Sequence, residues 1–390
     1  MRCVYLDRLS DEYFAPLGHN PDKEKVVDAT SISVGLGERS YPIHIGPGIR
    51  KTIATDLQNL KIGRKYGVIT DTNVGRLYGG QFMQALGEKN IAGQLFTLPA
   101  GESGKTLQTI GDLASRLVES GFDRSDALIA FGGGVVGDIT GFLASCYMRG
   151  VPFVQVPTTL LAQVDSSVGG KTGVDIPEGK NLVGAFYQPK GVYIDIEYLQ
   201  TLPKEEYQGG LAEVIKYAVI RDSSLYTFLE HKQAAIKKLH AAELTAMITR
   251  CCAIKAEVVA RDEKEGGLRR ILNYGHTIGH AVEAASDFSI IHGYAVAIGM
   301  VAAAQLAPKS LENCDDITQN LANLLIAYGL PTSIPKDLDP DEMARYLRAD
   351  KKTVNGRLFF VLPEQIGKVC ITDQVKSGDI DAILHRTLHL

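Results

Sequence analysis

The segment Phe131-Gly-Gly-Gly-Val-Val-Gly-Asp138 decides the fold class of this chain. It matches the pattern G-x-G-x-x-G, directly follows an apolar run at residues 127–131, and precedes residues with a helical pattern. Glycines at such a strand-to-helix turn let the backbone approach a pyrophosphate, whose negative charge is favoured at the N-terminus of the helix. The segment therefore predicts a dinucleotide site in an α/β fold.

A second interpretation of the segment stays open. A tight strand-to-helix turn that binds no ligand has the same appearance, because glycine serves both purposes. The acidic residue that usually follows about 20 positions later is also missing, since Pro157 and Thr158 stand there. A dinucleotide bound at this turn would use a variant of the standard geometry.

The surrounding chain indicates a parallel sheet followed by helices. Runs typical of strands occur at residues 66–70, 95–98, 127–131, 153–156 and 192–195, with helical patterns such as residues 106–120 between them. After Leu202 and Pro203 the pattern is helical, and the apolar residues 295–307 predict a buried helix too short to span a bilayer. A small hairpin is expected at residues 356–362 and 369–372.

These patterns divide the chain into three parts. We expect a poorly structured extension at residues 1–38, an α/β domain at residues 39–202, and a mostly α-helical domain at residues 203–390. The loop at residues 165–181 combines flexible glycines with lysines and is expected to be irregular.

The composition excludes some classes of partner. The chain has 390 residues, and its 41 Lys and Arg face 45 Asp and Glu, which leaves a formal net charge of -4. No global positive field is available to hold a nucleic acid or an anionic membrane, so we expect neither as a partner. The six cysteines are scattered without a C-x-x-C pair, which favours a reducing cytoplasm over a disulfide framework.

Two segments imitate the phosphate loop of nucleotide triphosphatases. Both Gly104-Lys105-Thr106 and Gly170-Lys171-Thr172 end in the required Gly-Lys-Thr. Pro99 and Asp165 stand where the motif needs its first glycine, so neither segment can wrap a phosphate in that way. We therefore reject a nucleotide triphosphatase with this phosphate loop.

Histidines clustered at helical spacing indicate a metal site. His276 and His280 lie one helical turn apart, and His292 follows twelve residues after His280. A lone histidine on an apolar helix is more often a hydrogen-bonded core residue, but three so close together favour a site. Thr277 follows His276 where a zincin would have glutamate, so that class of metalloprotease is excluded.

Glu213 is the best carboxylate to complete the metal site. Its segment, residues 210–220, is apolar on nearly all sides, and a charge there is expensive unless it is paired or bound to a metal. Lys216 lies three residues later on the same face, so a simple intrahelical ion pair is the alternative.

A local set of cations could bind a phosphorylated substrate. Most single lysines are solvated surface residues, and each cation of this set, taken alone, could be one. Taken together they supply the charge that a phosphate requires. The set comprises Lys171, Lys180, Arg149, Lys216, Lys255 and Arg269, with Asn181 beside Lys180.

Seven motifs together resemble the 3-dehydroquinate synthase family of sugar phosphate cyclases. The resemblance runs in order over roughly residues 40 to 370 and is highly specific. It rests on Gly-Gly-Gly-Val-Val-Gly-Asp (132–138), Val-Pro-Thr-Thr-Leu-Leu-Ala (156–162), Asp-Ser-Ser-Val-Gly-Gly-Lys-Thr-Gly-Val (165–174), Gly-Lys-Asn (179–181), Ala-Glu-Val-Ile-Lys (212–216), Glu-Gly-Gly-Leu-Arg (265–269) and Asn-Tyr-Gly-His-Thr-Ile-Gly-His (273–280).

This resemblance implies a Rossmann-like N-terminal domain, a helical C-terminal domain and an active site in the cleft between them. It implies that Glu213, His276 and His292 hold one divalent metal ion, zinc or cobalt. The positions that match NAD contacts are Asp71, Asn73, Glu102, Lys105, Gly133, Gly134, Val135, Asp138, Thr158, Thr159 and Asp165. Those that match substrate contacts are Lys171, Lys180, Asn181, Lys216, Lys255, Arg269, Asn273, His280 and, more loosely, Lys351. Arg149 matches a phosphate contact made across a homodimer interface.

The reaction that the resemblance implies converts 3-deoxy-D-arabino-heptulosonate 7-phosphate to 3-dehydroquinate and phosphate. Transient oxidation by NAD, β-elimination of phosphate, re-reduction and an intramolecular aldol closure follow one another, so no net oxidation occurs. Three rivals remain: another NAD- and metal-dependent cyclase, a metal-dependent polyol dehydrogenase that would release NADH, and a non-catalytic NAD sensor.

One position departs from the family pattern. The family usually has His-Gly-Glu where this chain has His292, Gly293 and Tyr294. If the usual glutamate orients a metal-binding imidazole, tyrosine offers a polar oxygen without a full negative charge. We therefore expect Tyr294 to weaken the support of His292 and to lower metal affinity moderately.

Overall fold

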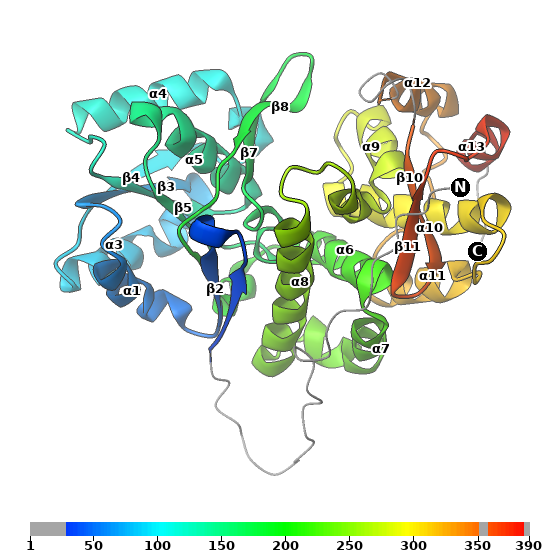
Figure 1. The fold of residues 1–390 in the computed structure, drawn as a ribbon, viewed down its shortest axis with the longest axis horizontal. Coiled ribbons are helices and arrows are strands. Elements are labelled where there is room, and N and C mark those ends of the chain that lie inside the picture. The colour runs from blue at the N-terminus through cyan, green and yellow to red at the C-terminus, as the bar shows by residue number, and fades with distance from the viewer. Residues whose placement is uncertain (1–28, 351–357, 386–390) are drawn as a thin grey trace, which may run out of the picture.

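The computed structural model describes residues 29–350 and 358–385, and it joins a seven-stranded sheet to a helical part (Figure 1). The strand order is β1-β2-β9-β6-β5-β3-β4, and every pair is parallel except β1 with β2. The strands are β1 (Thr30–Val34), β2 (Tyr41–Gly46), β3 (Lys65–Asp71), β4 (Ala92–Leu98), β5 (Ala127–Gly132), β6 (Phe153–Pro157) and β9 (Val192–Asp195). This confirms the Rossmann-like N-terminal part and the five strands expected from the sequence.

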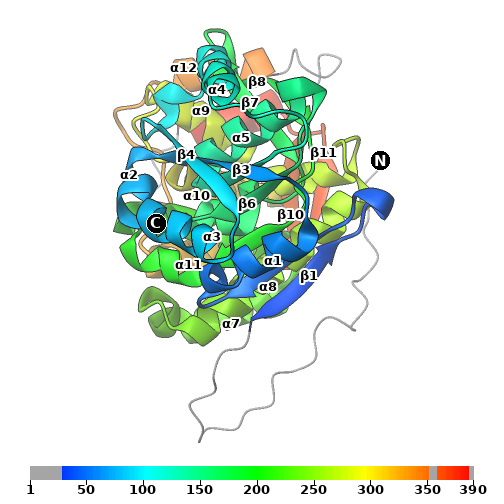
Figure 2. The same ribbon diagram turned by 90° about the vertical axis from the view of Figure 1, so that its left-hand side faces the viewer.

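Helices cover both faces of the sheet, which explains why its central strands are continuously apolar (Figure 2). In β5, which is buried throughout, Leu128 packs towards α4 (Leu107–Glu119) and α5 (Gly134–Cys146), whereas Ile129 packs towards α1 (Ile53–Leu60) and α3 (Gly80–Glu88). Helix α4 matches the pattern expected at residues 106–120. A short helix α2 (Thr72–Val74) follows β3.

The chain changes from strands to helices after Leu202, as expected. The helices of this part are α6 (Lys204–Arg221), α7 (Ser223–Lys237), α8 (Ala241–Arg261), α9 (His276–Ala285), α10 (His292–Ser310), α11 (Thr318–Ala327), α12 (Pro340–Asp350) and α13 (Ser377–Leu384). Helix α10 contains the buried helix expected at residues 295–307. No helix in the described ranges is both long and apolar enough to cross a membrane.

The two parts share one apolar core. Residues of β1, β2 and β9, among them Val34, Ile43 and Ile194, belong to the same buried cluster as the helices from α6 to α11. Helix α8 packs against β1 and β2 and carries this cluster from the sheet into the helical part. The sheet and the helices are therefore held in fixed positions by a common core.

Two expectations need correction. Residues 30–34, which we assigned to a poorly structured extension, form β1 and pair with β2. The segment at residues 165–181, expected to be irregular, begins in a π-helical turn (Ala162–Ser166) and continues into the hairpin of β7 (Lys171–Ile176) and β8 (Gly179–Phe186). The terminal hairpin of β10 (Phe360–Gln365) and β11 (Lys368–Thr372) confirms the expected one within the described residues.

Glycine contacts bring α9 and α10 unusually close together. A Cβ atom built on Gly299 of α10 would lie 1.9 Å from the carbonyl oxygen of Gly275 and 2.7 Å from the backbone nitrogen of Gly279. No side chain fits there without separation of the two helices. This approach fixes the relative positions of the histidines that both helices carry.

Replacing Gly299 with alanine should therefore destabilise the protein by about 1–3 kcal/mol, because the methyl group overpacks a backbone contact. Chemical denaturation measures the change. Gly111→Ala is the matched control: Gly111 is an exposed position of α4 with no atom within 4 Å of its built Cβ, so alanine should stabilise the helix by about 0.5–1 kcal/mol. Equal effects of the two substitutions would contradict the packing argument.

Candidate functional site

The carboxyl ends of β3 and β5 form the first half of the site. After β3 the chain turns towards β4 at one edge, and after β5 it turns towards β6, so a crevice opens between these strand ends. Asp71 lies at the end of β3, and its carboxylate accepts hydrogen bonds from the backbone nitrogens of Asn73 (2.8 Å) and Val74 (3.0 Å). Gly133 is the N-cap of α5.

This half of the site fits a dinucleotide. No side chain caps the N-terminus of α5, so the first-turn N–H groups of Gly134 and Val135 are not satisfied by a capping side chain. The Thr158 hydroxyl is buried and lacks a hydrogen-bond partner. A Cβ atom on Gly133 would lie 3.0 Å from Cγ2 of Thr159, so the glycine keeps the loops after β5 and β6 in contact.

Lys105 joins the dinucleotide half to the β7–β8 hairpin. Its buried ammonium lies 2.7 Å from the Asp138 carboxylate and donates to the Asn181 side-chain oxygen at 2.6 Å, while Glu102 lies further away at 3.8 Å. The Asn181 backbone nitrogen also donates to Asp175 of the same hairpin. The structure thus brings together three residues expected to contact NAD and one expected to contact substrate.

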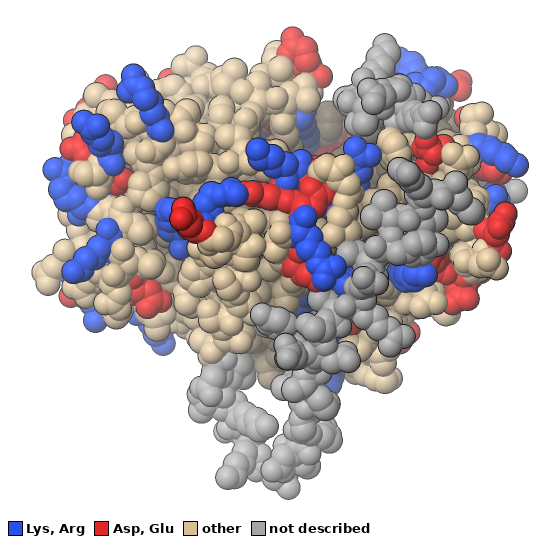
Figure 3. All heavy atoms as spheres, viewed as in Figure 1, with Lys and Arg blue, Asp and Glu red and all other residues tan. Residues whose placement is uncertain are grey.

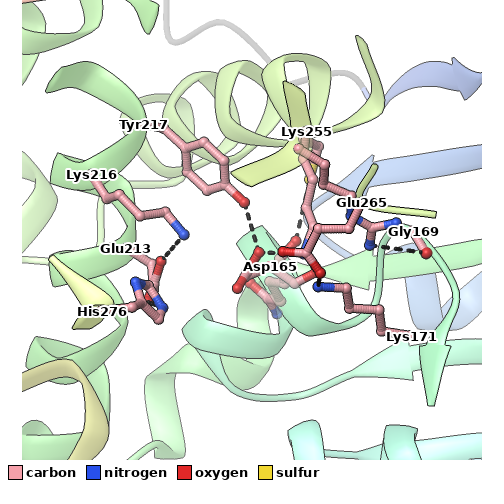
Figure 4. Close-up of polar contacts among 12 residues, drawn as sticks. Asp165, Gly169, Lys171, Glu213, Lys216, Tyr217, Lys255, Glu265 and His276 are labelled. Atoms are coloured by element: carbon pink, nitrogen blue, oxygen red, sulfur yellow. Dashed lines mark hydrogen bonds and ion pairs between the residues drawn. The ribbon is translucent and has the colours of Figure 1, made fainter. Parts of the chain in front are cut away.

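Asp165 lies deeper, between the sheet and α6. It forms an ion pair with Lys255, and it accepts a hydrogen bond from the Tyr217 hydroxyl at 2.8 Å (Figure 4). Burial would raise the pKa of Asp165, but Lys255 and Lys216 hold it well below its usual range. Burial lowers the pKa of Lys255 to about 8, because Asp165 offsets the lost hydration only in part and Arg269 adds like-charge repulsion.

The second half of the site is a carboxylate with histidines around it. Glu213 on α6 is fully buried and forms an ion pair with Lys216 one turn later (Figure 4). Its Oε1 lies 3.4 Å from Nε2 of His276 at the start of α9, and 3.7 Å from Nε2 of His292 at the start of α10. Burial would raise the pKa of Glu213, but Lys216 and His276 lower it to about 2. The carboxylate is therefore ionised.

The imidazoles present the same nitrogen to Glu213. Nδ1 of His276 lies 3.1 Å from the Tyr274 carbonyl oxygen, and Nδ1 of His292 lies 3.0 Å from the Glu283 carboxylate. With Nδ1–H donated to these acceptors, Nε2 of each ring is free to bind a metal. Oε2 of Glu213 is ion-paired with Lys216, whereas Oε1, although buried, has no hydrogen-bond partner among the described residues. This donor set fits a divalent ion.

A second group of ligand atoms shares His292. Among the described residues, potential ligand atoms lie within 4.8 Å of one another in two groups: Glu213 with His276 and His292, and His280 with Glu283 and His292. The ring of His280 lies 5.3 Å from that of His276 and 5.9 Å from that of His292, measured between centroids. His280 is exposed; it belongs to the second group and lies beside the first.

Glu283 is a functional residue that the sequence did not single out, and it supports His292 although position 294 carries tyrosine. Its carboxylate, and not the side chain at position 294, supports His292. The Tyr294 hydroxyl instead donates to the Gln208 side-chain oxygen at 3.1 Å. The sequence spacing could have indicated this residue. Glu283 lies seven residues after His276 and three after His280, so all three share one face of α9.

The remaining cations occupy different surroundings. Lys171, with its side chain 49% exposed, forms an ion pair with Glu265, which also accepts from the Asn273 side chain at 3.0 Å. Arg269 is buried and donates to the carbonyl oxygens of Glu263 and Gly169. The contact of Arg269 with Gly169 holds the turn that leads into the β7–β8 hairpin, a role that the motif alone did not reveal.

Two expected substrate residues lie outside this cluster. Arg149 is exposed at the end of the turn Tyr147–Arg149, where both Met148 (φ 50°) and Arg149 (φ 67°) adopt left-handed backbone conformations. Such conformations are strained for residues other than glycine and are frequent at functional sites. Lys351 lies outside the described residues. Charges of both signs gather across the middle of the face seen in Figure 3.

Comparison with known proteins gives consistent matches. Models of the 3-dehydroquinate synthase N-terminal and C-terminal families match residues 95–209 and 210–353. The 3-dehydroquinate synthase of Desulforamulus reducens is 47% identical over 355 residues, which are 91% of this chain and 99% of the relative.

Solved structures of sugar phosphate cyclases share the fold. A 2-deoxy-scyllo-inosose synthase complexed with carbaglucose-6-phosphate, NAD+ and Co2+ has a TM-score of 0.83 at 28% identity, covering 92% of this chain and 100% of that chain. The 2-epi-5-epi-valiolone synthase of Streptomyces hygroscopicus, with NAD+ and Zn2+ bound, has a TM-score of 0.82 at 29% identity, covering 90% and 97%. An iron-containing alcohol dehydrogenase, 15% identical at a TM-score of 0.65 over 90% and 98% of the chains, shares the fold alone.

The geometry around His292 predicts that Tyr294→Phe leaves metal affinity within about a factor of three, because the Glu283 contact stays intact. Loss of a residue that orients a metal-binding histidine would instead cost ten- to a hundredfold. The substitution should lower the free energy of unfolding by about 1 kcal/mol, the usual effect of one lost hydrogen bond. Zinc titration against a competing chelator gives the affinity. A tenfold loss would show instead that Tyr294 itself supports His292.

Proposed function

Because the chain belongs to the 3-dehydroquinate synthase family, we propose that Glu213, His276 and His292 hold one divalent ion, zinc or cobalt, beside a bound NAD. The chain converts 3-deoxy-D-arabino-heptulosonate 7-phosphate to 3-dehydroquinate and phosphate, a carbon–oxygen lyase reaction of the shikimate pathway. The observation that carries the proposal is the convergence of the three ligand atoms within 4.8 Å of one another, from three separate helices.

Hydrogen bonding favours this ligand set over the one that contains Glu283. Both oxygens of Glu283 already have partners, because Oε1 contacts Lys180 and Oε2 contacts His292 at 3.0 Å each. Of the Glu213 oxygens, Oε2 is ion-paired with Lys216, whereas the buried Oε1 has no hydrogen-bond partner among the described residues. An ion between Oε1 of Glu213 and the two imidazoles therefore satisfies a buried oxygen while the Lys216 ion pair on Oε2 stays in place.

The crevice at the ends of β3 and β5 would hold NAD. The expected contacts combine the open N-terminus of α5, the Thr158 hydroxyl and the carboxylate of Asp71. When bound, NAD supplies a reversible hydride acceptor, and the metal polarises substrate oxygens as a Lewis acid. Asp138 and Lys105 then border the cofactor and Asn181 the substrate, so their mutual contacts hold the two ligands side by side.

The cations around Asp165 and Glu265 would bind the anionic groups of the substrate. Lys171 has an exposed ammonium and is suited to the phosphate, with Asn273 held beside it by Glu265. Lys255 and Lys216 are buried and already charge-balanced, so they suit substrate groups that lie deeper. Arg269 positions the loop, and His280 borders the ligand histidines as a donor to substrate.

The assembly and location follow from the family. We propose a homodimer in which Arg149 reaches the phosphate of the neighbouring subunit, which would explain the strained backbone that presents its side chain outwards. Lys351 is proposed as a further substrate contact. The cytoplasm is the proposed compartment, and the scattered cysteines, which include no C-x-x-C pair, agree with it.

We expect chelation to abolish turnover, and zinc or cobalt to restore it. Glu213→Gln should lose metal affinity by at least about tenfold, because a neutral amide replaces the only carboxylate of the ligand set. NAD affinity should stay unchanged. Glu257→Gln is the control, since Glu257 is another ion-paired carboxylate, but its charged partners, Arg221 and Arg261, lie outside the ligand set. Full activity without metal would refute the ligand assignment.

One assay separates this reaction from its rivals. Protein, NAD, zinc and heptulosonate 7-phosphate are mixed, and phosphate, dehydroquinate and NADH absorbance are followed together. We expect many phosphates per bound NAD with no accumulating NADH. A polyol dehydrogenase would accumulate NADH in step with substrate loss, and a sensor would release no phosphate.

The lowered pKa of Lys255 predicts a pH limit. Its ammonium is present below about pH 8 and is lost above it, so kcat/KM should decline on the alkaline side as the anionic substrate loses a partner. Lys255→Arg should retain its charge and remove this decline, because arginine stays protonated beyond pH 12. Lys237→Arg, on the exposed surface of α7, should leave the profile unchanged. A decline that persists in Lys255→Arg would assign the limit to another group.

A further inference from the structure

The two carboxylate oxygens of Glu283 contact residues from two different elements, β8 and α10. The carboxylate lies on α9 and is largely buried. Oε1 lies 3.0 Å from the ammonium of Lys180 on β8, and Oε2 lies 3.0 Å from Nδ1 of His292 at the start of α10. One carboxylate thus connects a residue of the hairpin to a proposed metal ligand.

The partners of the two ligand histidines differ in kind. His276 donates to the carbonyl of Tyr274, two residues earlier in its own chain segment, so backbone holds this ring. His292 depends on a side chain from a different helix. A side-chain carboxylate also carries charge, and its effect on the imidazole depends on what else it contacts.

Lys180 can leave Glu283 for another anionic partner. Its side chain is 36% exposed, and its ammonium lies 4.2 Å from the centroid of the Phe288 ring, which is itself exposed at the end of α9. The hairpin stands between the sheet and α9 (Figure 1). An ion pair at this exposure contributes at most about 1 kcal/mol, so an anionic ligand in the cleft can compete for the ammonium.

We propose that Glu283 is a positioning residue that couples the β7–β8 hairpin to the metal centre. With Lys180 on Oε1, the carboxylate shares its charge between ammonium and imidazole. When an anionic ligand draws Lys180 away, Glu283 acts on His292 alone, and the imidazole becomes a stronger ligand. By linkage, a bound metal favours the anion by the same factor. The inference rests on the metal site proposed above.

Glutamine tests this coupling because it offers a single acceptor oxygen and no charge. Glu283→Gln can accept from His292 or from Lys180, but not from both. Metal-stripped full-length protein is titrated with cobalt against a competing chelator, and the visible absorption of the bound cobalt is recorded. We expect Glu283→Gln to weaken cobalt binding ten- to a hundredfold with the shape of the spectrum retained.

Two further variants make the test specific. Tyr294→Phe is the matched control, since it removes a hydrogen bond of α10 two residues from His292 without touching Glu283. Lys180→Met should tighten cobalt binding roughly two- to fivefold, because it frees Glu283 for His292. In the Glu283→Gln background, Lys180→Met should have no effect, so the double-mutant cycle shows coupling through the carboxylate.

The outcomes separate this inference from the metal site itself. No cobalt bound by the unmodified protein would overturn both. Normal cobalt binding with unchanged affinity in Glu283→Gln, or an equal loss in Tyr294→Phe, would overturn the inference alone. A changed spectrum in Glu283→Gln, with normal binding in Glu213→Gln, would make Glu283 a ligand. If Glu283→Gln fails to fold, Lys180→Met decides, and an unchanged affinity there would overturn the proposal.

Discussion

The structure depends on one fully buried carboxylate. Placing the Glu213 charge inside an apolar helix costs several kcal/mol unless partners compensate for the lost water. Lys216 supplies an opposite charge from the same helix and contacts Oε2, but it leaves Oε1 without a hydrogen bond. The histidines of α9 and α10 can approach only because glycines at positions 275, 279 and 299 let these helices pack backbone to backbone. The fold thus gathers three helices around a charge that needs a further ligand.

The sheet meets this centre through side chains that link separate elements. Lys105 bridges the dinucleotide loops to the hairpin, and Glu283 bridges the hairpin to His292. Asp165, which follows β6, contacts Tyr217 of α6 and Lys255 of α8. Carboxylates at the boundaries therefore hold the cations in place before substrate arrives. This arrangement limits the reorganisation that binding requires.

Much of this organisation was predictable from the sequence, and the failures have physical reasons. Apolar runs predicted the parallel strands, because strands buried on both faces carry no polar alternation. The β7–β8 hairpin was missed because its glycines suggest flexibility, whereas Gly184 serves a close contact: its built Cβ would lie 2.1 Å from the Thr172 carbonyl oxygen. Tyr294 does not contact His292, because residues two apart on a helix face different directions, and its effect on metal affinity stays a prediction. Contacts between elements, such as Glu283 with His292, require the tertiary structure.

The shared apolar core has a consequence for dissection of the protein. Strands β1, β2 and β9 and the helices from α6 to α11 bury one another in a single cluster. A fragment that began at Lys204 would expose the side of α8 that β1 and β2 cover. The complementary fragment, which would end before Lys204, would expose the surface of β1 and β2 that α8 covers. Large uncovered apolar surfaces of this kind promote aggregation. Separate expression of the two halves should thus yield insoluble material, although the sequence pattern suggests two domains.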